Sequence, residues 1–235
     1  MAKLNCDGQT IRKINSSIRQ FISVGESVTV ESPNARHNLG VALLGSGDVT
    51  FQGSVGYYCG GLMDGATIRV GGNAGWGLAE SMLGGQVAVE GNAGNSAGAA
   101  MRGGTLIVQG DSGARTGVSI KNGLIIVTGN CGYMSGFMGQ GGKMIICGNA
   151  AEALGDSMYE TICFVGGKIA DLGNDAIVVD STDEDKDFLD SSLGKYLPDS
   201  IRKNLPDGRD FKKVVSGKKL WNFDKSEWKT WEQAL

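Results

Sequence analysis

Apolar residues alternate with other residues in short segments that recur along the centre of the chain. One apolar position repeats every 19 residues, and a second apolar position follows it two residues later. The first set is Val49, Ile68, Val87, Leu106, Ile125, Met144 and Cys163, and the second is Phe51, Val70, Val89, Val108, Val127, Ile146 and Val165. A period of two is typical of a β-strand that buries one face. The pattern therefore predicts seven short strands in this part of the chain.

A glycine motif follows each strand with the same period. Its first glycine recurs at Gly53, Gly72, Gly91, Gly110, Gly129, Gly148 and Gly167. Further glycines three and seven residues later give the motif G-x-x-G-x-x-x-G, in which alanine replaces some of them. These connections hold too much glycine for a helix. We therefore expect each strand to pair in parallel with the next, in an all-β solenoid of about seven 19-residue coils. A leucine-rich repeat is the main alternative, but its return segment needs apolar residues.

Two roles are expected for these glycines, and a polar column lies beside them. A short coil must turn sharply, and glycine adopts a positive φ without steric cost. Glycine also has no Cβ, so neighbouring coils can come close together. The residue after the first glycine is Asn73, Asn92, Asp111, Asn130 and Asn149 in successive coils. Because stacked amides hydrogen-bond along cross-β arrays, we interpret this column as a structural ladder.

The outward-facing strand position becomes apolar in the later coils. It reads Thr50, Arg69, Ala88, Ile107, Ile126, Ile145 and Phe164, with Leu124 and Ile162 beside it. An apolar stripe on the outside of a rod has to be covered. The cover is either the C-terminal segment of the chain or a partner protein, and the two are equally favoured. If a partner covers it, Ile126→Asp should spare the monomer and weaken the assembly.

The repeat occupies residues 28–179 and leaves a segment at each end. In residues 1–27 the apolar residues Ile11, Ile14, Ile18, Phe21 and Ile22 have the spacing of one helical face. We expect this segment to cap the open end of the sheet.

The C-terminal extension, residues 180–235, is richer in charge. Residues 180–190 have the composition of a linker, and Phe188, Leu189, Leu193 and Leu197 predict a short helix that ends at Pro198. The last residues hold Trp221, Trp228 and Trp231. Aromatic residues in a charged tail favour docking onto a surface, either of this chain or of another subunit.

Composition and charge narrow the classes of function. The net charge is −3, so no electrostatic footprint for nucleic acid is present. The five cysteines form no CxxC pair, which favours reduced thiols in a cytoplasmic protein. No apolar run approaches the ~20 residues of a membrane span, and the first residues lack the apolar core of a signal peptide. We therefore expect a cytoplasmic protein that binds neither nucleic acid nor a membrane.

Little in the sequence points to chemistry. Residues 94–98 match the G-x-S-x-G nucleophile motif through Ser96, but they are one copy of the repeat and the other copies lack the serine. His37 is the only histidine, and a structural role is favoured for it. Residues 136–144 resemble a phosphate loop, but the first glycine is one place off and Met144 replaces Ser or Thr. We expect no catalytic residue, metal ligand or bound cofactor in this chain; a hydrolase that uses Ser96 is the alternative from another class.

The G-x-x-G-x-x-x-G coils resemble the GXGXG family. Its members include the C-terminal β-helix domain of the large glutamate synthase subunit and the β-helix subunit of formylmethanofuran dehydrogenase. Four stretches look most similar to the separate β-helix subunit of N-methylglutamate synthase and of split glutamate-synthase-like enzymes. These are Arg36-His37-Asn38-Leu39-Gly40, Gly53-Ser54-Val55-Gly56-Tyr57-Tyr58-Cys59, Gly72-Asn73-Ala74-Gly75 and Gly155-Asp156-Ser157-Met158-Tyr159-Glu160. The resemblance covers roughly residues 28–180 and is more specific for the family than for one enzyme.

This resemblance implies a right-handed, single-stranded parallel β-helix without catalytic residues. The chain would be a structural subunit of a higher hetero-oligomer in nitrogen or methylamine metabolism. It would space a class II glutamine amidotransferase-like subunit from a glutamate synthase-like subunit that holds FMN and an iron–sulfur cluster. Cys6 is not N-terminal and does not match the amidotransferase nucleophile, and no cysteine spacing matches a cluster site. The alternative is the β-helix subunit of a formylmethanofuran dehydrogenase or formyltransferase/hydrolase complex.

Overall fold

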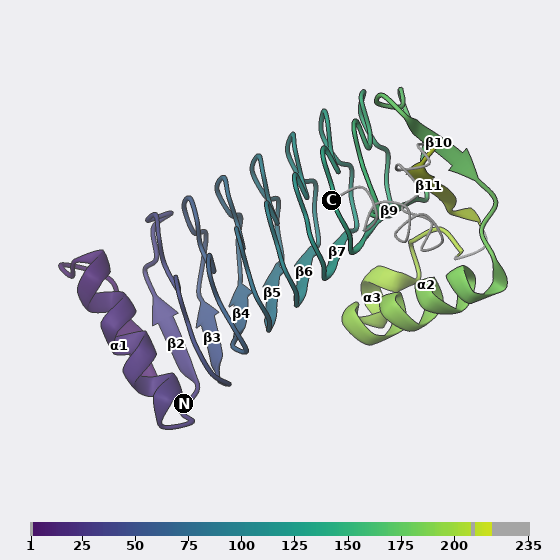
Figure 1. Ribbon diagram of the computed structural model, residues 1–235. Helices are drawn as coiled ribbons and strands as arrows, with labels where there is room; N and C mark the ends of the chain where they lie inside the picture. Colours follow the sequence, from purple (N-terminus) through teal and green to yellow (C-terminus); the bar gives the residue numbers. More distant parts are fainter. Residues whose placement is uncertain (1, 208–209, 218–235) are drawn as a thin grey trace, which may run out of the picture.

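A computed structural model describes residues 2–207 and 210–217 and has one sheet of eleven strands in these ranges. Nine strands, β1 to β9, pair in parallel in sequence order. They are β1 (Ala2–Asn5), β2 (Val28–Glu31), β3 (Asp48–Phe51), β4 (Thr67–Val70), β5 (Gln86–Val89), β6 (Thr105–Val108), β7 (Leu124–Val127), β8 (Lys143–Ile146) and β9 (Ile162–Val165). Figure 1 shows the strands side by side along a rod, with return loops on the opposite side from β2 onward. The predicted right-handed β-helix of about seven coils is confirmed.

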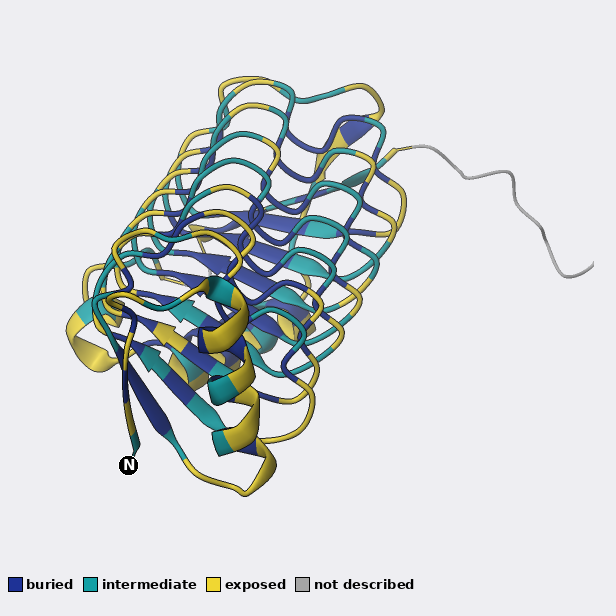
Figure 2. Cartoon of the chain, turned by 90° about the vertical axis from the view of Figure 1, so that its left-hand side faces the viewer, coloured by how far each residue is buried: buried dark blue, intermediate teal, exposed yellow. Residues whose placement is uncertain are grey.

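The strand register matches the period of the sequence. Val49 pairs with Ile68 and Phe51 with Val70, and each later pair of strands keeps the same 19-residue offset. Both predicted inward columns are fully buried, and Figure 2 shows buried residues in dark blue along the stacked strands. The register is strongly specified, because a slip by one residue would turn every buried side chain outward.

The first glycine of each motif is required for close approach and not for a left-handed turn. Of the seven, only Gly53 has a positive φ. At Gly110 a Cβ would collide with Oδ1 of Asn92 and lie 2.9 Å from the backbone of Gly91. The expected positive φ is therefore absent from the first glycine in six of the seven coils, and the expected close approach is confirmed there. The expected positive φ is found at the third glycine of the motif, for example Gly98 and Gly117, and other turn positions, such as those of Tyr58 and Leu62, are also left-handed.

The polar column forms a ladder along the rod. The backbone N–H of Asn92 donates to Oδ1 of Asn73 over 2.8 Å, and that of Asp111 donates to Oδ1 of Asn92 over 2.8 Å. The series continues through Asn130 and Asn149 to the N–H of Lys168. The predicted ladder is present, but the side chains accept mainly from the backbone of the next coil. Each bond satisfies an N–H that the glycine turn leaves without a strand partner.

A helix closes the N-terminal end. Helix α1 (Ile11–Ser23) begins after Thr10, whose hydroxyl accepts from the N–H of Lys13. Its buried residues Ile14, Ile18 and Ile22 belong to the core of the rod, as the spacing predicts. Strand β1 was not predicted, and it extends the parallel sheet by one strand beyond β2.

The C-terminal segment returns to the same sheet. Strand β10 (Ala176–Val179) is followed by helices α2 (Asp183–Tyr196) and α3 (Asp199–Arg202) and by β11 (Lys212–Ser216). Strand β11 lies antiparallel between β9 and β10, so β10 does not pair with β9. The expected linker at residues 180–190 is mostly helix, because Thr182 and Asp185 form a capping box at the start of α2.

Val108 tests the inward column. It is fully buried, and Val108→Asp would place an unpaired charge in the core at a cost of about 3–5 kcal/mol. We expect a large fall in the free energy of unfolding measured by urea titration. The exposed change Arg102→Asp on the preceding loop is the control and should leave the midpoint nearly unchanged. A native-like midpoint for Val108→Asp would contradict the inward assignment.

Gly110 tests close approach between coils. Gly110→Ala places a methyl group on Asn92 and Gly91, so we expect a loss of about 1–3 kcal/mol in unfolding free energy from overpacking. Gly61→Ala is the matched control, because its Cβ would meet nothing closer than the carbonyl of Tyr58 at 3.3 Å. Equal unfolding midpoints for the two variants would show that coil spacing does not exclude the side chain.

Candidate functional site

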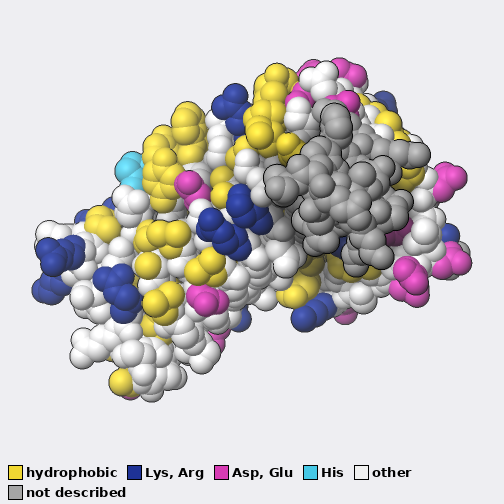
Figure 3. Space-filling view, in the orientation of Figure 1, with side chains coloured by type: hydrophobic (Ala, Val, Ile, Leu, Met, Phe, Trp, Pro, Cys, Tyr) yellow, Lys and Arg dark blue, Asp and Glu magenta, His cyan; other side chains and the backbone are white. Residues whose placement is uncertain are grey.

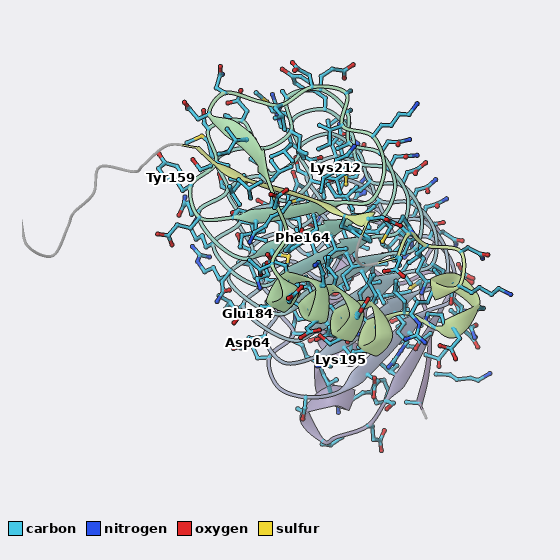
Figure 4. The ribbon with its side chains drawn as sticks, turned by 90° about the vertical axis from the view of Figure 1, so that its right-hand side faces the viewer. Asp64, Tyr159, Phe164, Glu184, Lys195 and Lys212 are labelled. Atoms are coloured by element: carbon cyan, nitrogen blue, oxygen red, sulfur yellow. The ribbon has the colours of Figure 1, made fainter. Side chains whose placement is uncertain are left out.

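The outward apolar stripe is covered by the chain's own C-terminal segment. Helix α2 lies against the outer face of the sheet, and Figure 4 shows Phe164 beside this helix, whose ends carry Glu184 and Lys195. The covered cluster consists of Ile107, Ile126, Ile145, Cys147, Phe164, Leu189, Leu193, Leu197 and Phe211. The rings of Phe164 and Phe188 lie 5.9 Å apart, and Nζ of Lys143 lies 3.9 Å from the centre of the Phe188 ring.

An ion pair fastens α2 to the sheet. Nζ of Lys213, on β11, donates to Oδ2 of Asp185 over 2.6 Å, and both side chains are largely buried. The N–H and hydroxyl of Thr182 donate to the same carboxylate. Burial alone would raise the pKa of Asp185, but these hydrogen bonds and the charge of Lys213 outweigh it and hold the pKa below its ordinary value. At the other end of α2, hydrogen bonds with Thr105 on β6 and with Lys195 on the same helix lower the pKa of Tyr196.

The candidate partner surface is therefore largely occupied. Ile107, Ile126, Ile145 and Phe164 are fully or almost fully buried beneath α2, and Leu124 and Ile162 are half-buried at its margin. The sequence allowed either the C-terminal segment or a partner protein to cover the apolar stripe, and in the structure the C-terminal segment covers it. This corrects the expectation for a partner on these side chains, and Ile126→Asp should destabilise the chain itself. Trp221, Trp228 and Trp231 lie outside the described residues.

Ser96 and His37 do not form a catalytic pair. The N–H of Ser96 donates to the carbonyl of Ala114 in the next coil, and the residues after the serine form turns where a nucleophile elbow requires a helix. His37 stacks on Tyr57 with ring centres 4.3 Å apart, and its Nδ1 accepts from the N–H of Tyr57. Its ring is three coils away from Ser96, about 14 Å at ~4.8 Å per coil.

The cysteines are structural. Burial raises the pKa of the Cys59 and Cys163 thiols to about 12, so both stay protonated at neutral pH. Within residues 2–207 and 210–217, no group of three or more His, Cys, Asp or Glu side chains is placed to hold a metal ion. None of the helices in these ranges is long and apolar enough to cross a bilayer.

A second apolar surface was missed in the sequence. Tyr57 and Trp76 stack at 5.5 Å, Tyr58 meets Tyr57 edge-on, and all three are exposed. Leu44, Leu62 and Leu83 are exposed on the loops of the same early coils. Figure 3 shows hydrophobic side chains gathered here, some of them beside the single histidine. The sequence does contain a signal for this aromatic cluster. Tyr57 and Trp76 are 19 residues apart, and His37 precedes Tyr57 by one coil with one inserted residue.

Comparison with known proteins gives one structural neighbour. No family model and no curated protein matches the chain. The solved formyltransferase/hydrolase complex (FhcABCD) from Methylorubrum extorquens, in complex with methylofuran, contains a chain that is similar with a TM-score of 0.59. The match covers 86% of this chain and 91% of that chain at 17% identity. At this identity the likeness shows the shared fold.

Asp185 tests whether the ion pair holds α2 in place. Asp185→Asn should lower the protection of α2 against hydrogen exchange by about 1.5–3 kcal/mol, because Lys213 loses its charged partner. Asp183→Asn changes an exposed carboxylate on the same helix and is the control. The pKa of Asp185 is depressed in the folded state, so its contribution is complete above the unfolded value of ~3.9 and is lost as pH falls through the folded value. Equal protection of α2 in the two variants at pH 7 would show that the Lys213–Asp185 ion pair does not hold α2 in place.

Proposed function

We propose that this chain is an architectural subunit of a multi-subunit enzyme complex and has no active site of its own. The observation that carries the proposal is a closed, apolar rod that still exposes Tyr57, Tyr58, Leu62 and Trp76. Large exposed apolar clusters on a soluble protein mark interaction sites. The parallel coils from β1 to β9 give a stiff body on the order of 40 Å long, which suits a spacer between other subunits.

A formyltransferase/hydrolase-type complex is the assembly that the comparisons favour. The similar solved chain comes from such a complex and is matched over most of its length. In this proposal the partners carry the catalytic groups, and this chain holds them in a fixed arrangement. The support lies in the shared fold, and in the presence of that fold in a multi-subunit assembly.

A glutamate-synthase-type complex is the second candidate. It is supported by the G-x-x-G-x-x-x-G coils and by the stretches around His37 and Tyr57 that resemble the GXGXG family. Its partners would be a class II amidotransferase-like subunit and a subunit with FMN and an iron–sulfur cluster.

Purification of the native assembly tests the proposal and separates the two candidates. The tagged full chain should elute with other subunits in a fixed ratio, measured by native mass spectrometry. Subunits with formyl-transfer activity and no flavin absorbance would support the first candidate. Flavin absorbance together with bound iron would support the second. A chain that elutes alone from its native source would contradict an architectural role.

A further inference from the structure

A hollow opens on the loop side of the first coils. It has a volume of about 240 Å³ and is lined by Asn38, Val41, Tyr58, Gly61, Leu62, Glu80 and Ser81. Tyr58 and Leu62 are 47% and 52% exposed. Both have a positive φ, a backbone conformation that large side chains rarely adopt. Most later coils place small residues in the left-handed position of Leu62, such as Ser81, Ala100 and Ser119. The turn therefore does not require a side chain as large as leucine at this position.

Gly77 brings an aromatic ring and a carboxylate together beside this hollow. A Cβ on Gly77 would lie 2.6 Å from Cδ1 of Tyr58 and 3.1 Å from Oε2 of Glu80. The ring and the carboxylate therefore both lie beside the bare backbone of Gly77. Other coils carry a side chain at this position, namely Ser96, Arg115, Met134 and Ala153. A side chain at position 77 would fill the space that the ring and the carboxylate share.

Glu80 gives this hollow its charge preference. Its side chain is half-buried, and within the described part of the chain it takes part in no hydrogen bond or ion pair. A carboxylate beside a tyrosine ring favours a planar cation, because the guanidinium of arginine stacks on the ring and pairs with the carboxylate. Val41 and Leu62 add apolar walls for the methylene stem of the same side chain.

The surroundings indicate a protein as the source of this cation. Leu44, Leu83 and Trp76 are 68%, 44% and 54% exposed on the same coils and their neighbours. Arginine that inserts among tyrosine, tryptophan and leucine side chains is typical of the centre of a protein interface. We propose that the Tyr58–Glu80 hollow receives an arginine side chain from another subunit of the complex. This inference rests on the proposed architectural function.

Charge and shape variants in the full-length tagged chain test the inference. We expect Glu80→Arg and Leu62→Asp to weaken retention of one neighbouring subunit at least tenfold, and Glu80→Gln to weaken it less. Retention is measured by mass photometry of the purified assembly across a dilution series. Met138→Asp is the matched control, since Met138 is exposed and occupies the same left-handed coil position as Leu62. Circular dichroism melting of each variant separates lost docking from lost folding.

Crosslinking identifies the occupant. A photoreactive benzoylphenylalanine in place of Tyr58 should crosslink to an arginine-containing peptide of another subunit. Changing that arginine to glutamate should break the assembly, and combining it with Glu80→Arg should restore it. Crosslinks only to a second copy of this chain or to its own residues 218–235 would overturn the inference.

The two proposals fail differently. An assembly that retains its subunits with Glu80→Arg and Leu62→Asp would overturn the hollow as a docking site and leave the architectural function standing. A wild-type chain with no partner subunits would overturn both.

Discussion

Close parallel pairing between successive coils is the constraint on which the rest of the structure depends. Neighbouring strands lie ~4.8 Å apart, and at this spacing no Cβ fits at Gly72, Gly91 or Gly110. The same spacing lets each asparagine reach the backbone N–H of the next coil. Pairing, glycine turn and ladder therefore share one period of 19 residues from β3 to β9. The interior of the described coils is filled mainly by Val, Ile, Leu and Met side chains.

The rod has two apolar surfaces, of which one is covered by the chain's own helices and the other is exposed. On the strand side, α2 and α3 cover Ile126 and Phe164, and the Lys213–Asp185 pair holds this cover on the sheet. On the loop side, Tyr57, Tyr58 and Trp76 are exposed in the described structure. A rigid body with one face sealed by its own chain and another face available for contact fits a subunit that acts by positioning others.

The sequence predicts what repeats and misses what depends on distant contacts. Val108 and Ile125 could be placed in the core because their columns recur every 19 residues. Strand β11 could not be foreseen, since Lys212–Ser216 pairs with residues far away in the chain and lies outside the repeat. The stripe over Ile107 to Phe164 was recognised, but its cover depends on how α2 folds back. Tyr58 and Glu80 lie beside Gly77 because the coil turns through left-handed residues that are not glycine. The types of these residues do not indicate a positive φ in the sequence.

Electron cryo-microscopy of the native assembly tests the central claim most directly. We expect a stack of parallel coils that bridges the catalytic subunits, with Tyr58 and Leu62 in contact and every cofactor and substrate held by neighbours. Density for a substrate or cofactor enclosed by the side chains of this chain would contradict the claim, as would a rod that touches no second subunit.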